Sequence, residues 1–264
     1  MRHRVWFVTG ISRGLGKAIA QCAIGGGDFV VGTTRSGEAP ADLPPQRLAV
    51  LKVDMRDTEG VASAVRAAAD LKGRLDVLVN NAGYGLLGPV ETASADEVGA
   101  VFETNVFGPI AAIRAALPIM RAQRSGHIIN ISSVAGMAPA PGTGIYSATK
   151  AALSAMSYSL AAELAPHGVR VTAVSPGSFR TEFLEPRSVR QTGQATTGYE
   201  ETAEPTIDAL LRKSLKQIGD PERAAAAIAE IVRAEADPLD LLLGSDALER
   251  VQSRGARFQA DIQA

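Results

Sequence analysis

The sequence predicts an α/β fold: a Rossmann-like, doubly wound parallel sheet of about seven strands with helices on both faces, in one domain over residues 1–264. Short apolar runs rich in β-branched residues alternate with longer helical segments, and this alternation is typical of parallel sheets. The runs are apolar throughout rather than at every second position, as expected for strands covered on both faces. Together these patterns indicate a parallel, doubly wound sheet.

The expected strands share the apolar, β-branched composition, and the expected helices share apolar residues at helical spacing. The strands are predicted at 5–9, 29–33, 48–53, 77–80, 127–131, 170–174 and 239–243. The helices are predicted at 14–24, 58–71, 95–124, 146–164 and 221–235. The last helix has the clearest start, because Asp220 is a good N-cap and Pro221 suits the first helical position.

Composition excludes several classes of protein. The formal net charge is −1 and no block of basic residues occurs, so we expect neither a nucleic acid nor a membrane as partner. Cys22 is the only cysteine, which excludes internal disulfides and thiolate zinc sites and fits a reducing cytoplasm. The apolar run near the N-terminus is too short for a signal peptide, and no run reaches the ~18 apolar residues of a membrane span. We therefore expect a cytoplasmic protein without a metal site.

A glycine-rich turn joins the first expected strand to the first expected helix. Glycine lets the backbone approach a pyrophosphate closely, and the N–H groups at the helix start attract phosphates. The spacing of Gly10, Gly14 and Gly16 is one residue longer than the most familiar dinucleotide fingerprint. The residues expected to bind the cofactor here are Gly10, Ser12, Arg13, Gly14, Leu15 and Gly16.

The end of the second strand indicates which cofactor binds. NAD sites place an acidic residue there for the ribose 2′-hydroxyl, whereas this chain has Arg35 and no acidic residue until Glu38. Arg35 suits a 2′-phosphate, and Arg13 could reach the same group. NADP(H) is therefore the preferred cofactor and NAD(H) remains possible. The alternative is that both arginines are solvated loop charges.

Tyr146 and Lys150 are four residues apart, so they lie on the same helix face. A tyrosine hydroxyl has a pKa near ~10, and a nearby ammonium favours its ionised form. Such a pair can transfer a proton to or from an alcohol or carbonyl oxygen. The spacing alone is also common on solvated helix faces, so the prediction depends on the rest of the chain.

These motifs together resemble the short-chain dehydrogenase/reductase family, from the N-terminus to about Thr181. The resemblance implies a catalytic tetrad of Asn105, Ser133, Tyr146 and Lys150. It also implies cofactor contacts from Asp54, Met55, Asn81, Ala82, Gly83, Tyr146, Lys150, Pro176, Gly177, Phe179 and Thr181. The family's usual interval of thirteen residues before the tyrosine selects Ser133 over Ser132.

The implied reaction is hydride transfer between the nicotinamide and a ketone or secondary alcohol, with Tyr146 as general acid or base. By resemblance, Ser133 binds the substrate oxygen, and Lys150 lowers the pKa of Tyr146 and holds the nicotinamide ribose. Asn105 would hold a water that relays protons. The family also implies a homodimer or homotetramer, assembled through the alanine-rich apolar segments 98–122 and 148–162.

An irregular stretch at 182–205 follows a predicted strand, and we expect a substrate lid over 182–218. The alternative is a surface excursion. The expected pocket walls are mostly apolar, which favours a small-molecule substrate that is a hydrophobic ketone or alcohol. These walls are Tyr84, Val134, Ala135, Phe179, Phe183 and Leu184.

Three other functions stay open at this stage. The first is a cofactor-sensing regulatory protein with the same fold, although such proteins usually lack the catalytic tyrosine or lysine. The second is an NAD-preferring alcohol dehydrogenase. The third, a sugar-nucleotide epimerase or dehydratase, would need a larger C-terminal domain than the residues after Thr181 provide.

Overall fold

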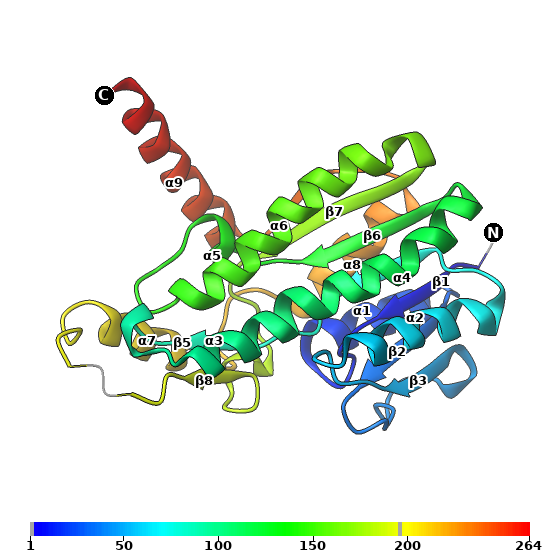
Figure 1. The fold of residues 1–264 in the computed structure, drawn as a ribbon, viewed down its shortest axis with the longest axis horizontal. Coiled ribbons are helices and arrows are strands. Elements are labelled where there is room, and N and C mark those ends of the chain that lie inside the picture. The colour runs from blue at the N-terminus through cyan, green and yellow to red at the C-terminus, as the bar shows by residue number, and fades with distance from the viewer. Residues whose placement is uncertain (1–2, 195–196) are drawn as a thin grey trace.

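A computed structural model describes residues 3–194 and 197–264. Its centre is a parallel sheet of seven strands in the order β3-β2-β1-β4-β6-β7-β9, with helices on both faces (Figure 1). The predicted fold class is therefore confirmed. Residues 195 and 196 of the predicted lid lie outside the described residues.

The elements alternate along the chain as expected. The strands are β1 (Val5–Val8), β2 (Phe29–Thr34), β3 (Leu48–Lys52), β4 (Val77–Asn80), β5 (Gly85–Leu87), β6 (Gly126–Ile131), β7 (Val169–Pro176), β8 (Val189–Gln191) and β9 (Asp240–Leu243). The helices are α1 (Gly14–Gly25), α2 (Thr58–Lys72), α3 (Ala95–Phe102), α4 (Gly108–Gln123), α5 (Val134–Met137), α6 (Gly144–Leu164), α7 (Ala203–Leu211), α8 (Pro221–Arg233) and α9 (Ser245–Gln263).

Two hydrophobic layers enclose the sheet. Helices α1 and α8 pack on one face, and α2, α4 and α6 pack on the other. Strand β1 shows why its run is apolar throughout: Trp6 and Val8 belong to the first layer and Phe7 to the second. Because successive side chains of a strand point to opposite faces, a strand between two layers has no solvent side.

The strand order creates a crevice at one edge of the sheet. Strand β1 pairs with β2 on one side and with β4 on the other, so the connections leave β1 and β4 in opposite directions. Ligands of open parallel sheets bind outside the carboxyl ends of the strands at such a switch point. The chain segments that follow β1, β4, β6 and β7 all meet there.

The C-terminal third contains elements that the periodicity did not indicate. Strand β8 pairs with β5 in a small parallel sheet, and α7 follows within the predicted lid. Helix α9 is 19 residues long and was not predicted. The predicted helix 95–124 is divided by one π-helical turn, Glu103–Phe107, between α3 and α4.

The segment Ala95–Gln123 is 29 residues long and contains an 18-residue window of mean hydropathy 1.2, so it could span a membrane by length and composition alone. The sequence expectation concerned uninterrupted apolar runs, and charged residues such as Glu103 and Arg114 interrupt this segment. Its inner face is already used within the fold, because Ala112, Ile113, Ala116 and Met120 pack in the core layer with α2. Packing within the fold thus accounts for part of its apolar character, since 44% of that window is buried.

Candidate active site

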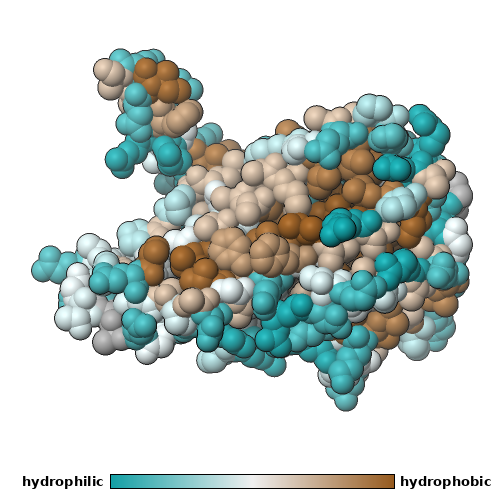
Figure 2. Space-filling model, viewed as in Figure 1, coloured by the Kyte–Doolittle hydropathy of each residue, from teal (hydrophilic) through white to brown (hydrophobic). Residues whose placement is uncertain are grey.

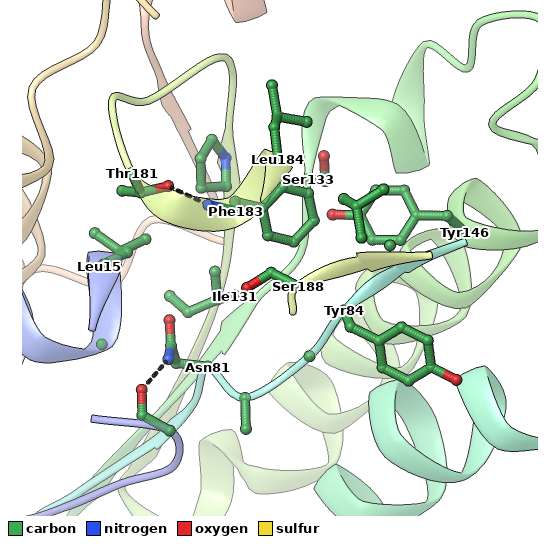
Figure 3. Close-up of a pocket in the computed structure, with 18 of the residues that line it drawn as sticks. Leu15, Asn81, Tyr84, Ile131, Ser133, Tyr146, Thr181, Phe183, Leu184 and Ser188 are labelled. Carbon is green, nitrogen blue, oxygen red and sulfur yellow. Dashed lines mark hydrogen bonds between the residues drawn. The ribbon is translucent and has the colours of Figure 1, made fainter. Parts of the chain in front are cut away.

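A cavity of about 430 Å³ opens at the carboxyl ends of the strands (Figure 3). This volume is within the range of small-molecule and cofactor sites. Every residue predicted to bind the cofactor lines it, and so does each predicted substrate wall. Of the predicted catalytic residues, Ser133, Tyr146 and Lys150 line the cavity, whereas Asn105 lies behind its wall.

The glycine turn is built by hydrogen bonds between the ends of β1 and β4. The side-chain Nδ2 of Asn81 donates to the carbonyl oxygens of Thr9 at 2.9 Å and Gly10 at 3.1 Å. A β-carbon on Gly16 would lie 2.3 Å from the Gly10 oxygen, so only glycine lets α1 start this close to β1. Gly10 also has a φ of +74°, a conformation that favours glycine.

Three guanidinium groups meet at the α1 end of the cavity. Arg13 donates to the Ser188 hydroxyl at 2.7 Å and to the Arg187 carbonyl at 3.3 Å, and Arg35 lines the same cavity. Burial lowers the pKa of Arg13, and the charges of Arg187 and Arg35 lower it further. A partly buried cluster of like charges is stabilised by an anion. The Glu182 carboxylate acts in the opposite direction on this pKa, so three arginines and one carboxylate leave the cavity beside the glycine turn with a net positive charge.

Asp54 and Met55 also line the cavity, on the side of Arg35. The Asp54 carboxylate makes an ion pair with Arg56 at 2.8 Å, and its hydrogen bonds with this guanidinium hold the pKa of Asp54 below its ordinary value. Asp54 is consequently a charged hydrogen-bond acceptor at this edge of the cavity.

Ser133 and Tyr146 face each other across the cavity, with their hydroxyl oxygens turned together (Figure 3). Ser133 is placed by the end of β6, where its Oγ also accepts the Ala135 N–H at the start of α5. Tyr146 lies in the first turns of α6 and is only 9% exposed. Burial raises the pKa of Tyr146 to about 12, against the opposing effect of its hydrogen bond with Ser133.

Lys150 is one turn further along α6, and its ammonium lies 5.9 Å from the centre of the Tyr146 ring. Its Nζ donates to the Ile131 carbonyl at 2.9 Å, and burial lowers the pKa of Lys150 to about 8. Burial has the larger effect on Tyr146, and the pKa of Tyr146 therefore stays above its ordinary value. The hydrogen bond with Ser133 is the effect that opposes burial at Tyr146, and the expected lowering of the Tyr146 pKa by Lys150 stays a prediction.

Ser132 and Ser133 have different surroundings, as their adjacent positions require. The Ser132 hydroxyl is buried and donates to the Lys150 carbonyl at 2.9 Å, and it lies 2.8 Å from the Ser154 hydroxyl. Ser132 thus ties the end of β6 to α6, while Ser133 remains available to the cavity.

Asn105 is 1% exposed in the π-helical turn, and protein groups occupy its amide. Its Oδ1 accepts the Tyr84 N–H at 3.0 Å, and its Nδ2 donates to the Tyr84 carbonyl at 2.9 Å and to Thr149 Oγ1 at 3.1 Å. The side chain therefore clamps the cavity wall at Tyr84 to the helix residue beside Lys150. This arrangement favours a positioning role over the water-binding role that the resemblance implied for its side chain.

The predicted lid segment is attached to the body at several points. Strand β8 pairs with β5, Thr192 hydrogen-bonds Thr92 at 2.7 Å, and the Phe183 ring lies 5.8 Å from the Tyr146 ring. Tyr84 lines the cavity, but its hydroxyl points away from Tyr146 and its ring lies under Arg190 (Figure 3). The segment thus forms one wall of the site beside Tyr146.

Two residues of this wall, Arg187 and Ser188, were missed by sequence reasoning. They lie between the short helix after Thr181 and β8, where no motif or periodicity marks them. Only the pairing of β8 with β5 brings them to Arg13, which is more than 170 residues away in the chain. No sequence signal could have found this contact.

The family model for short chain dehydrogenases matches residues 4–192. The chain belongs to the short-chain dehydrogenase family. It is accordingly an NAD(P)-dependent oxidoreductase that acts on CH–OH or C=O groups.

Individual relatives agree with this assignment. A crystal structure of a short-chain dehydrogenase from Streptomyces avermitilis is 40% identical, with a TM-score of 0.92 over 99% of this chain and 96% of that one. A metagenomic short-chain oxidoreductase in complex with NADP is 30% identical, with a TM-score of 0.72 over 91% of this chain and 96% of that one. The 3-ketodihydrosphingosine reductase of Bacteroides thetaiotaomicron is 36% identical over 92% of this chain and 89% of its own length.

The two adjacent serines give a matched pair of substitutions. We expect Ser133→Ala to reduce turnover at least tenfold and to cost about 0.5–2 kcal/mol of stability, because its hydroxyl also accepts the Ala135 N–H at the start of α5. Ser132→Ala should instead destabilise the fold by about 1–3 kcal/mol, because it leaves buried partners unsatisfied, while retaining most of the activity. Steady-state kinetics and urea denaturation of both variants distinguish the two roles, and the reverse assignment of effects would contradict them.

The two buried titratable groups predict the pH dependence. Reduction needs protonated Tyr146, which persists across neutral pH because its pKa is about 12. The Lys150 ammonium loses its proton as the pH rises through about 8, so kcat for ketone reduction should fall above this pH. Lys150→Arg, where it folds and turns over, should move the fall to higher pH. A flat profile of kcat from pH 6 to 10 in the unaltered enzyme would contradict this role.

Proposed function

We propose that the protein reduces hydrophobic ketones to secondary alcohols with NADPH, reversibly, with Tyr146 as general acid and, in the reverse direction, general base. The observation that carries the proposal is the single cavity. Its lining includes both the Ser133–Tyr146 hydroxyl pair and the cluster of Arg13, Arg35 and Arg187.

The residues present fit a phosphorylated dinucleotide. The positive charges of the arginine cluster repel one another, so a bound anion would stabilise them. The N-terminus of α1 presents free N–H groups to the same space. Gly10 and Gly16 remove the side chains that would keep a pyrophosphate from the backbone. Arg35 follows β2, where the 2′-phosphate of NADP(H) would be bound by charge-assisted hydrogen bonds.

When bound, the nicotinamide supplies the hydride that is transferred to the carbonyl carbon. Ser133 and Tyr146 would both hydrogen-bond the carbonyl oxygen, and Tyr146 would transfer its proton to it as negative charge develops there. Lys150 lies one turn after Tyr146 on α6, and its ammonium donates a hydrogen bond to the Ile131 carbonyl. It would return a proton toward Tyr146 and bind the nicotinamide ribose. Asn105 would keep the Tyr84 wall and Thr149 in register with these groups.

The lining of the cavity favours an apolar substrate. Leu87, Val134, Phe183, Leu184 and Val189 all contribute to the wall around the catalytic hydroxyls. Free sugars and charged acids would lose their hydration against these side chains without gaining hydrogen bonds. The relative that reduces 3-ketodihydrosphingosine, by its name, supports a ketone as the reacting group.

The catalytic proposal is tested with Tyr146→Phe. We expect NADPH oxidation with aliphatic, aromatic and steroid ketones to fall at least a hundredfold, because the proton donor is lost. NADPH binding, measured by titration calorimetry, should change less than threefold. Near-normal turnover of the variant would contradict the assignment. If the unaltered protein binds NADPH but oxidises it with no ketone, a regulatory function would be favoured instead.

Cofactor preference is tested at the arginine cluster. Arg35→Asp should weaken NADPH at least tenfold more than NADH, because it replaces a charge-assisted bond to the 2′-phosphate with repulsion. Arg187→Ala should weaken both cofactors if Arg187 faces the pyrophosphate, and NADPH alone if it faces the 2′-phosphate. Arg212→Ala, an exposed arginine outside the cavity, is the control. Equal effects of Arg35→Asp on the two cofactors would contradict the 2′-phosphate site.

A further inference from the structure

Helix α9 leaves the body of the protein almost at once. Its first turn is anchored where Asp246 accepts the Ser178 N–H at 2.8 Å and where Arg250 donates to the Ala138 carbonyl. Every residue from 252 to 264 is exposed, and the helix projects into solvent as a rod (Figure 1). An isolated helix of this length is marginally stable in water, so packing against another surface would stabilise it.

One side of the rod is apolar at a regular spacing. Leu248, Val251, Gly255, Phe258 and Ile262 follow one another at intervals of three, four, three and four residues. This is the heptad seam of a coiled coil, with 248, 255 and 262 at a positions and 251 and 258 at d positions. The side chains of Leu248, Phe258 and Ile262 are 49%, 53% and 63% exposed, and hydrophobic residues are visible on the rod in Figure 2.

We propose that α9 pairs in antiparallel orientation with α9 of a second copy of this chain. The seam itself indicates the orientation. In an antiparallel pair, a positions pack against d positions, so Gly255 would lie opposite Phe258 of the second copy, and Val251 opposite its Ile262. The missing side chain of Gly255 makes room for the ring. A parallel pair would place glycine against glycine and ring against ring.

The charges that flank the seam favour the same arrangement. Arg254 and Asp261 occupy the two g positions of the exposed part, while Gln252 and Gln259 occupy the e positions. In an antiparallel pair g positions meet g positions, so Arg254 of each copy would pair with Asp261 of the other, twice by symmetry. A parallel pair would bring Arg254 to a neutral glutamine. An antiparallel pair shifted by one heptad would place Arg254 of one copy opposite Arg254 of the other.

The same charges argue against two other partners. A helix that lies on an anionic membrane carries an excess of lysine and arginine on its polar face, whereas the exposed part of α9 has two arginines and one aspartate. A foreign protein would not require Arg254 and Asp261 to complement each other. One pair of helices is smaller than the ~800 Å² per partner of a stable interface, so we expect weak, concentration-dependent association through α9 alone.

The test uses complementary charge reversals in the full-length protein. Arg254→Asp and Asp261→Arg, each alone, should weaken association at least tenfold, since each creates two like-charge contacts. In each single variant, residues 254 and 261 carry charges of the same sign, so only contacts between the two variants can restore opposite-charge pairs. A mixture of the two variants should therefore associate as the unaltered protein does, because each charge then meets its opposite across the interface.

The measurement is sedimentation equilibrium over a range of concentrations, with circular dichroism to confirm that each variant is folded. Arg257→Asp makes the same charge change at an outer c position and should leave association unchanged. Ketone reduction per subunit should also be unchanged in Arg254→Asp and in Asp261→Arg. The proposal is overturned if either single variant associates normally, if the mixture fails to recover, or if the unaltered protein is monomeric and instead floats with anionic vesicles.

Discussion

The buried ammonium of Lys150 is the constraint on which the rest of the site depends. A buried charge needs hydrogen-bond partners, and here the Ile131 carbonyl at the end of β6 provides one at 2.9 Å. Ser132 adds a second tie from the same strand end to the Lys150 carbonyl. Gly136 permits this approach, because a β-carbon there would lie 2.8 Å from the Lys150 backbone. Helix α6 is thereby held against β6, and Tyr146 is brought opposite Ser133.

The same packing sets the properties of Tyr146, the proposed proton donor. Removing water raises the pKa of Tyr146 and lowers that of Lys150, so the two groups keep their neutral forms more readily than in water. A protonated tyrosine is the form that a ketone reductase uses. The arginine cluster lines the same cavity beside the glycine turn, so an anionic cofactor would bring its charge to the guanidinium groups.

The first residues of α9 contact the wall of the active-site cavity. Asp246, in the first turn of α9, accepts the N–H of the residue that follows the Pro176–Gly177 turn, and Arg250 lines the cavity. Pairing of α9 with a second copy would hold these residues in place without contributing any group to the reaction. The predicted assembly through α4 and α6 would use a different face, which carries a broad apolar area in Figure 2.

The sequence by itself determined the fold class, the cofactor turn and the spacing of Ser133, Tyr146 and Lys150. These features depend on local chemistry: apolar periodicity, glycine at close backbone approaches, and residues four apart on one helix. Only the tertiary structure decided how the groups act on one another. Burial set the Tyr146 and Lys150 pKa values, β8 brought Ser188 to Arg13, and Asn105 was engaged by the Tyr84 backbone. These effects depend on desolvation and on contacts between residues that are distant in sequence, so local patterns do not predict them. Helix α9 was not predicted because its five seam positions form a narrower apolar stripe than the face of a helix packed in a core.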